Sequence, residues 1–245
     1  MNQLKKLFTI LIFACYIIAA DKSYKIVSTE IQSFIKQDGS IDFIENREFD
    51  FTGSFTYVYQ DIPKKGFDQI YDIQVSANNI PFINSDSKEA GTFIIQERNS
   101  YYRIYLYHKS QDEKKLFTVK YSLRQPFTVG PNDSQFYWIY LSDKWDKKPG
   151  SLAISQTFVS PILEEDITYQ LERPSSSKEY NLNIEGNTLS FMSDDFSSST
   201  EMKLRTIFPS SYFVDVEINN ENFSLAKLEE KKRNKELVQY FIGFL

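Results

Sequence analysis

The chain has 245 residues with 33 acidic and 28 basic side chains, so its net charge is −5, and 41% of its residues are hydrophobic. These values are those of an ordinary folded protein and argue against a disordered chain, a collagen-like repeat or a multi-span membrane protein. The acidic balance also argues against a nucleic-acid partner, because such binding needs a basic face. The unusual feature is the content of 21 Phe and 16 Tyr, which favours β-strands.

Residues 1–20 have the features of a secretory signal peptide. Two lysines precede an apolar run from Leu7 to Ile18, and two alanines follow it. The run is too short to cross a bilayer comfortably. Because the one cysteine, Cys15, lies in this run, we expect the exported chain to contain no disulfide. We therefore expect a secreted or extracytoplasmic protein.

From residue 24 to residue 218, short segments alternate between apolar and polar residues, which is typical of β-strands. The Asp38-Gly39 turn predicts a hairpin between a strand over 26–35 and a strand over 41–51. Further alternating segments cover 55–59, 71–75, 102–106, 117–123, 189–191, 204–208 and 214–218. This pattern predicts an all-β fold, an antiparallel β-sandwich that forms one unit or two stacked halves divided near residue 150.

The segment 136–141 differs from the others because it is apolar or aromatic throughout. We expect it to form a strand that is buried on both faces. The polar atoms of Tyr137, Trp138 and Tyr140 would then need hydrogen-bond partners.

Residues 225–245 form a separate C-terminal segment. Its first part is dense in Leu, Ala, Lys and Glu, with Glu229 and Arg233 one helical turn apart, and predicts a short charged helix. The last nine residues, from Leu237, are almost wholly apolar. They are too few to cross a membrane, so they resemble either the start of a membrane span or a segment that folds back onto the core.

The residues that carry chemistry are few. His108 is the one histidine, so no histidine pair can hold zinc and no Ser-His-Asp arrangement is evident. Because a polar run follows it, we expect His108 to be an exposed loop residue. We expect no metal site, no cofactor and no catalytic site.

Paired carboxylates are the remaining enzymatic option, since glycoside hydrolysis needs two acids. The candidates are Glu45 with Glu48 and Asp50, or Asp143 with Asp146. We favour structural roles for them. Glu45 shares a strand face with a cationic neighbour and is expected to form a polar pair at a sheet edge or surface, while Glu48 and Asp50 face outward.

Aromatic residues offer a binding interpretation. Tyr57, Tyr59, Trp138 and Trp145 can stack on sugar rings if they are exposed. Core packing is the favoured alternative, because large aromatic side chains are buried on average.

Residues 38–53 read DGSIDFIENREFDFTG and residues 57–63 read YVYQDIP. They resemble the domain of unknown function 2207, a family at the N-terminus of predicted membrane proteins with a DG turn, a V-x-E strand, an aromatic-D-F-x-G segment and a Y-R-x-I-P ending. Gln60 stands where that ending has arginine. Residues 116–121, 135–138 with 144–146, and 204–209 agree in the same order. The matching positions are Asp38, Gly39, Glu45, Phe51, Gly53, Asp61, Pro63, Tyr121, Tyr137, Trp138, Trp145 and Pro209.

The resemblance implies an exported ectodomain that is usually followed by membrane spans, and it supplies no catalytic residues. We expect special backbone angles at Gly39 and Gly53 and the end of a strand at Pro63. Our first hypothesis is a non-catalytic extracytoplasmic β-sandwich module that binds a protein partner or an envelope component. The alternative is a secreted carbohydrate-binding or carbohydrate-active protein. Membrane association through the C-terminal segment is a further prediction.

Overall fold

The computed structural model describes residues 22–142, 147–172, 182–194, 196 and 201–242. The expected signal peptide at 1–20 and Trp145, Asp143 and Asp146 lie outside the described residues.

The described part of the chain is mostly β-structure with one longer helix at its C-terminal end. The strands are β1 (Ser23–Ile35), β2 (Ser40–Thr52), β3 (Ser54–Pro63), β4 (Gln69–Ala77), β5 (Ile80–Pro81), β6 (Ile83–Asn84), β7 (Thr92–Glu97), β8 (Tyr101–Gln111), β9 (Lys114–Arg124), β10 (Phe127–Val129), β11 (Asp133–Leu141), β12 (Ser151–Phe158), β13 (Thr168–Glu172), β14 (Leu182–Glu185), β15 (Thr188–Ser193) and β16 (Met202–Pro209). The helices are η1 (Glu164–Asp166), η2 (Ser210–Tyr212) and α2 (Leu225–Ile242).

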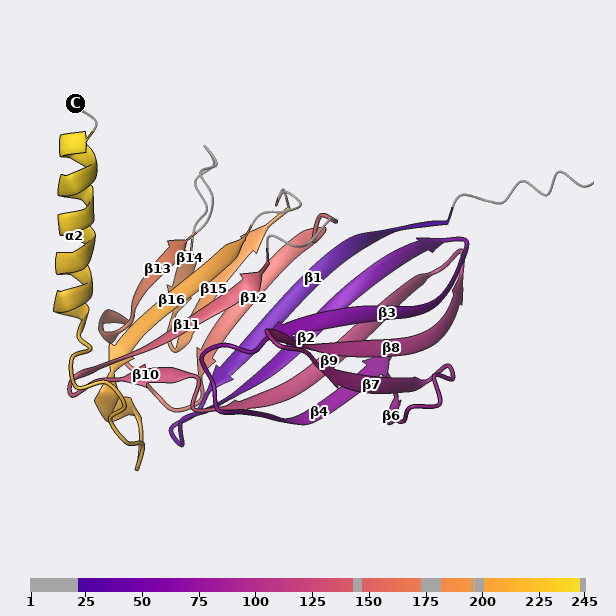
Figure 1. The fold of residues 1–245 in the computed structure, drawn as a ribbon, viewed down its shortest axis with the longest axis horizontal. Helices are drawn as coiled ribbons and strands as arrows, with labels where there is room; N and C mark the ends of the chain where they lie inside the picture. The colour runs from indigo at the N-terminus through magenta and orange to yellow at the C-terminus, as the bar shows by residue number, and fades with distance from the viewer. Residues whose placement is uncertain (1–21, 143–146, 173–181, 195, 197–200, 243–245) are drawn as a thin grey trace, which may run out of the picture.

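The strands form three sheets. The large sheet has the order β14-β15-β12-β1-β2-β9-β4-β5, the β3 sheet has the order β3-β8-β7-β6, and the β11 sheet has the order β10-β11-β16-β13. In Figure 1 the β3 sheet lies in front of β2, β9 and β4. The β3 sheet and the β11 sheet lie on the same face of the large sheet. Phe43 of β2 contacts Trp138 of β11, and Phe51 of β2 contacts His108 of β8. Both phenylalanines are odd-numbered residues of β2, so they point to the same side. The arrangement is sandwich-like, and within the described ranges the sheets do not close.

The predicted hairpin is confirmed. β1 and β2 pair antiparallel from Ser23↔Thr52 to Ile35↔Ile41, and the turn between them contains Gly39. Gly39 has φ +75° and Gly53 has φ +79°, so both have the special backbone angles that the sequence predicted. Pro63 is the last residue of β3, also as predicted. The sheets are not wholly antiparallel, however, because β1 pairs in parallel with β12 and β6 with β7.

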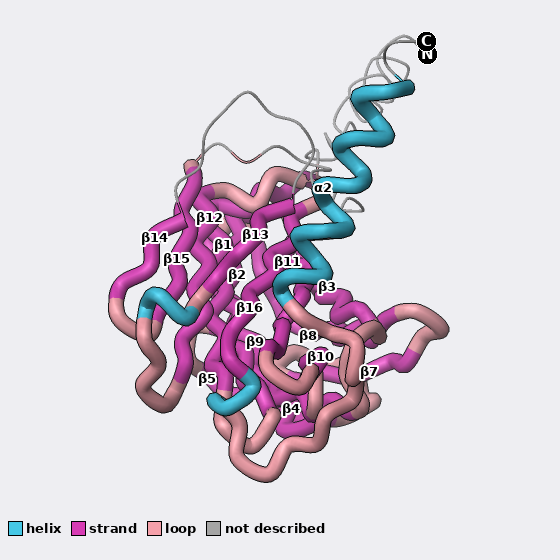
Figure 2. Tube along the Cα trace, turned by 90° about the vertical axis from the view of Figure 1, so that its left-hand side faces the viewer, coloured by secondary structure: helices cyan, strands magenta, loops and turns pink. Residues whose placement is uncertain are grey.

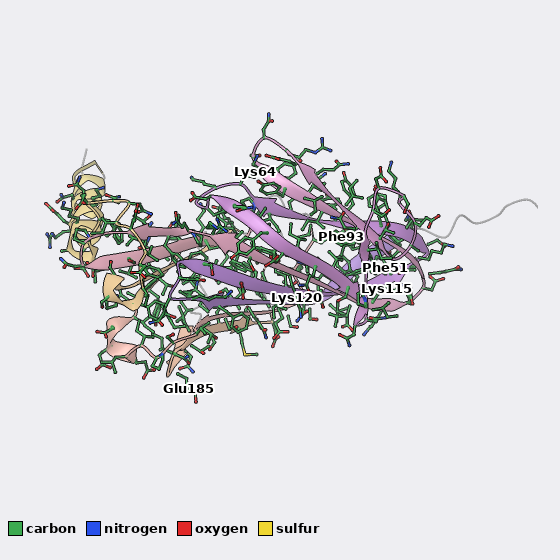
Figure 3. All side chains as sticks on the ribbon, turned by 90° about the horizontal axis from the view of Figure 1, so that it is seen from below. Phe51, Lys64, Phe93, Lys115, Lys120 and Glu185 are labelled. Atoms are coloured by element: carbon green, nitrogen blue, oxygen red, sulfur yellow. The ribbon has the colours of Figure 1, made fainter. Side chains whose placement is uncertain are left out.

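One hydrophobic core lies between the layers and takes residues from all three sheets. In Figure 3, Phe51 and Phe93 lie between the layers, whereas Lys64 and Lys120 lie toward opposite outer sides. The large sheet contains strands from both sides of residue 150, since β1 pairs with β12. A division of the domain near residue 150 stays a prediction.

The expectation that residues 136–141 form a strand buried on both faces is wrong for most of its length. In β11 the buried residues alternate with half-buried ones until Tyr140 and Leu141, which are both buried. The alternation arises because one face of β11 packs on the large sheet, while no described layer covers the other. The polar atoms of Tyr137 and Tyr140 do have partners: Tyr137 donates to Glu172, and Tyr140 contacts Ser33.

The expected charged helix is confirmed as α2, which continues through the first apolar residues to Ile242. It stands away from the sheets at one end of the molecule (Figures 1 and 2). Its first backbone N–H, at Leu225, donates to the Asp133 carboxylate at 2.9 Å. Among the described residues, no helix has both the length and the apolar character required to span a membrane. The start of a membrane span stays a prediction.

Candidate functional site

A buried ionic pair lies between the large sheet and the β3 sheet. Nη2 of Arg47 donates to Oε2 of Glu45 at 2.5 Å, and the hydroxyl of Tyr121 donates to Oε1 of Glu45 at 2.7 Å. Nη1 of Arg47 donates to Oε1 of Gln60, which reaches in from β3. Glu45 and Arg47 are 6% and 7% exposed, so their expected place at a surface or sheet edge is wrong. The β3 sheet covers the strand face on which they stand.

A cavity of about 30 Å³ adjoins this ionic pair. Residues that carry the family resemblance converge on it from separate strands: Glu45, Asp61, Pro63, Tyr121 and Trp138 all line it. A space of this size holds one or two water molecules and no substrate. Both oxygens of Glu45 already accept hydrogen bonds, and burial raises the pKa of Tyr121 well above its usual value. The arrangement therefore joins two layers through hydrogen bonds.

A second polar chain joins the β11 sheet to the large sheet. The hydroxyl of Tyr140 lies 3.0 Å from Oγ of Ser33 and accepts from Nε2 of Gln156 at 2.8 Å. Oγ1 of Thr206 in turn donates to Oε1 of Gln156. Burial raises the pKa of Tyr140 above its usual value, so this hydroxyl stays protonated. These polar residues satisfy one another inside an otherwise apolar core.

The expectation that His108 is an exposed loop residue is wrong. His108 belongs to β8, is 3% exposed and lies between the rings of Phe51 and Phe117, at 5.3 and 4.9 Å between centroids. Its Nδ1 lies 2.8 Å from Oγ of Ser110, and burial is the main cause that lowers its pKa to about 4. A neutral imidazole in this place packs as a core residue. The polar run over 109–115 that suggested a loop instead covers the end of β8, a short turn and the start of β9.

The outer face of the β3 sheet has the opposite character. Tyr57 and Tyr59 of β3 are 49% and 52% exposed, and they pair across the sheet with Tyr107 and Tyr105 of β8. The four rings contact one another, with centroids 5.8 Å apart for Tyr57 and Tyr105 and 6.1 Å apart for Tyr59 and Tyr105. The rings of Tyr105 and Tyr107 are nearly parallel, at 15° and 6.3 Å. We call these four tyrosines the tyrosine face.

Arg103 borders the tyrosine face and is held in a fixed position. Its Nε and Nη2 each donate to the carboxylate of Asp61 at 2.7 Å. Its guanidinium lies 4.0 Å from the centroid of the Tyr59 ring and 5.1 Å from that of Tyr101. The hydrogen bonds to Asp61 raise the pKa of Arg103 further above its already high value. The guanidinium thus lies over one face of the Tyr59 ring in a cation–π contact.

The four aromatic residues that the sequence offered as ligand-binding candidates therefore differ in their exposure to solvent. Tyr57 and Tyr59 are exposed, Trp138 is 5% exposed and packs on Phe43 in the core, and Trp145 lies outside the described residues. Sequence reasoning missed Tyr105 and Tyr107, because it considered the even-numbered residues of this strand, such as Ile104 and Leu106, which are the buried ones. The signal was present as tyrosines at 101, 105 and 107.

The other residues of the family motif stabilise turns, the core or the ends of strands. Asp38 caps the hairpin turn through its carboxylate, which accepts from N and Oγ of Ser40 at 2.9 and 2.6 Å. Phe51 is buried, and Pro209 ends β16. Within the described ranges, no three His, Cys, Asp or Glu side chains gather closely enough to hold a metal ion.

The fold and these sites define a mostly β protein of sandwich-like sheets, with two buried polar networks between its described layers and an exposed tyrosine face. The chain belongs to the family described as predicted membrane protein (DUF2207) N-terminal domain, whose sequence profile matches residues 25–217. No curated protein matches the chain.

Among solved structures, the chain is similar to a proposed nutrient-binding protein of Legionella pneumophila, with 12% identity and a TM-score of 0.45 over 76% of this chain and 67% of that one. It is also similar to a proposed protease of Parabacteroides distasonis, with 7% identity and a TM-score of 0.43 over 75% of this chain and 40% of that one. A third is leukotriene A4 hydrolase of Saccharomyces cerevisiae, with 8% identity and a TM-score of 0.42 over 79% and 31%. The chain thus spans about two fifths of the length of the Parabacteroides protein. These distant similarities carry no conclusion about activity.

Proposed function

We propose that the chain is a non-catalytic extracytoplasmic module that binds a protein partner or an envelope component through its tyrosine face. The observation that carries this proposal is the exposure of Tyr57 and Tyr59, which are about half exposed on the outer side of β3. Exposed aromatic clusters are uncommon away from binding surfaces, because removing such rings from water is favourable.

Membership of a family of predicted membrane proteins supports the extracytoplasmic place. The signal-like sequence of residues 1–20 agrees with it. In this arrangement the β-domain lies outside the cytoplasm, where its tyrosine face can meet the cell envelope or a protein bound to it.

The described carboxylates support a non-catalytic role. Glu45 is engaged by Arg47 and Tyr121 in a space too small for a substrate. Glu48 and Asp50 lie on the opposite face of β2, as expected, and Asp50 pairs with Lys25 at 3.2 Å. His108 is buried between phenylalanines and lies away from solvent.

The test is co-sedimentation of the purified chain with envelopes isolated from its own cells. We expect the wild-type chain to sediment with the envelopes and the Tyr57→Ala, Tyr59→Ala double variant to remain in the supernatant. Tyr169→Ala is the matched control, because Tyr169 is 39% exposed but belongs to β13 of a different sheet. Equal sedimentation of all three chains contradicts the proposal. So does hydrolysis of envelope material by the wild-type chain that a carboxylate substitution abolishes.

A further inference from the structure

The arrangement of the tyrosine face indicates what kind of ligand it takes. Its rings stand in cross-strand register, with Tyr57 opposite Tyr107 and Tyr59 opposite Tyr105, and Ile94 of β7 lies opposite Tyr105 on its other side. Outward residues of a strand are about 6.6 Å apart, so successive rows of rings repeat at roughly the length of one sugar unit. Rings on the two strands are tilted by 51–59° to each other, so the surface is a repeating but twisted row of aromatic rings.

The charged groups next to the rings are already paired. Asp61 and Arg103 form two hydrogen bonds with each other, and Nζ of Lys64 lies 2.5 Å from Oε1 of Glu97 beyond them. A charged ligand that lay across the rings would have to replace one of these pairs. The surface therefore complements a ligand without charge.

Hydrogen-bonding groups remain available at the border of the rings. A guanidinium has five N–H groups. Asp61 receives two of those of Arg103, and a further side-chain hydrogen bond joins Arg103 to Tyr105, so the remaining N–H groups are those left for a ligand. Each tyrosine adds a hydroxyl that donates and accepts. A ligand that combines flat C–H surfaces with many hydroxyl groups fits this mixture, and sugar rings have that composition.

A protein partner fits the surface less well. Binding energy between proteins concentrates in side chains that enter pockets. The cavity beside Glu45 and a second cavity between Phe127 and Val216 are not lined by a tyrosine of the face. The face itself is a row of repeating rings, which suits a chain of repeating sugar units better than a single protruding side chain.

We propose that the tyrosine face binds a neutral polysaccharide, whose sugar rings stack on Tyr57, Tyr59, Tyr105 and Tyr107 while Arg103 donates to their hydroxyls. This inference rests on the proposed binding function and names its ligand class. The C–H face of a hexose packs on the electron-rich face of each ring, so several successive sugar units share the binding energy.

Calorimetric titration of the purified chain with cellohexaose, laminarihexaose, chitohexaose and mannohexaose tests the inference, with hexagalacturonate as an anionic probe. We expect at least one neutral hexasaccharide to bind, with a Kd that changes less than about twofold between about 0.1 and 1 M NaCl, since salt screens only charged contacts. Tyr57→Ala and Tyr59→Ala should each weaken binding about tenfold. Tyr59→Phe, which keeps the ring, and Tyr169→Ala should stay within about threefold.

Three results overturn the inference: none of the neutral hexasaccharides binds, the alanine variants bind as tightly as the wild type, or hexagalacturonate alone binds and salt abolishes its binding. Binding of a proline-rich peptide through the same tyrosines, without hexasaccharide binding, assigns the face to a protein partner instead. The envelope sedimentation experiment distinguishes failure of the ligand class from failure of the binding function. If it depends on Tyr57 and Tyr59 while no hexasaccharide binds, the ligand class is wrong and the binding function stands.

Discussion

Oε2 of Glu45 lies 2.5 Å from Nη2 of Arg47, and both side chains are more than nine-tenths buried between two sheets. Glu45 also receives the hydroxyl of Tyr121 from β9, and Arg47 donates to Gln60 from β3. The pair thereby connects the large sheet with the layer that carries the tyrosine face. Losing one member leaves the other charge buried without its partner, which is the costly case for an ionic pair.

Arg47→Met should therefore destabilise the chain strongly. We expect the free energy of unfolding to fall by about 3–5 kcal/mol, as when one partner of a buried ion pair is removed. Urea unfolding followed by tryptophan fluorescence measures it. Lys25→Met is the control, since Lys25 pairs with Asp50 at an exposed position and should cost at most about 1 kcal/mol. A loss from Arg47→Met no larger than this would contradict the role assigned to the pair.

Gln60 leads to a second prediction, because the family resemblance of the sequence implies arginine at this position. Gln60→Arg alone places a second guanidinium beside Arg47, and we expect it to lower the free energy of unfolding by about 3 kcal/mol. The double variant Arg47→Gln, Gln60→Arg restores one cation beside Glu45.

Urea unfolding of both single variants and the double variant forms a double-mutant cycle. We expect a favourable coupling of at least about 1 kcal/mol, because the two positions share one network. Additive losses would mean that residue 60 cannot supply the cation in this chain.

His108 should make stability depend on pH. Burial lowers its folded pKa to about 4 from 6.5, with Lys115 and Lys22 lowering it further and Glu113 opposing them. The unfolded chain then binds the proton more readily, so the contribution of neutral His108 is complete above pH 6.5 and is lost as the pH falls toward about 4. The expected loss is about 3 kcal/mol over this range.

Two measurements check the prediction for His108. It is the one histidine of the chain, so its NMR titration gives the pKa directly, and a midpoint near 6.5 would contradict its burial. Unfolding free energies measured between about pH 7 and pH 4 should fall less steeply for His108→Gln than for the wild type. Carboxylates titrate in both chains, so the difference between the two slopes belongs to residue 108.

Gly150 should tolerate no side chain. Its φ is +69°, and a Cβ there would overlap the carbonyl group of Val27, next to the point where Thr29 donates to the Pro149 carbonyl at 2.7 Å. We expect Gly150→Ala to lower the free energy of unfolding by about 3 kcal/mol or more, as strain adds to the overlap.

Gly66→Ala is the matched control for Gly150. Gly66 also has positive φ, at +87°, but no described atom lies within 4 Å of the place that a Cβ would take. It should lose only the strain of about 1–2 kcal/mol. Thermal unfolding of both variants separates the two contributions, and equal losses would exclude an effect of the overlap.

Many strand positions could be read from the sequence, since alternation of apolar residues is a local property, but the strand expected over 214–218 does not form. The face of β2 from Ile41 to Phe51 is buried at every second residue, as its pattern required. The sequence did not predict the burial of β11. This segment is apolar throughout, yet one of its faces is only half-buried, because no described layer covers it. Apolar residues permit burial without requiring it.

The sequence by itself determined the hairpin, the glycine turns, the end of β3 at Pro63 and the family, because each depends on residues that are close together in the chain. Only the tertiary structure decided that Glu45, Arg47 and His108 are buried and that Tyr57 and Tyr59 remain exposed. A strand pattern divides residues into two faces. Which face another sheet covers depends on the packing of distant strands, and here the covering layer buried the charged pair and left the tyrosines on the outside.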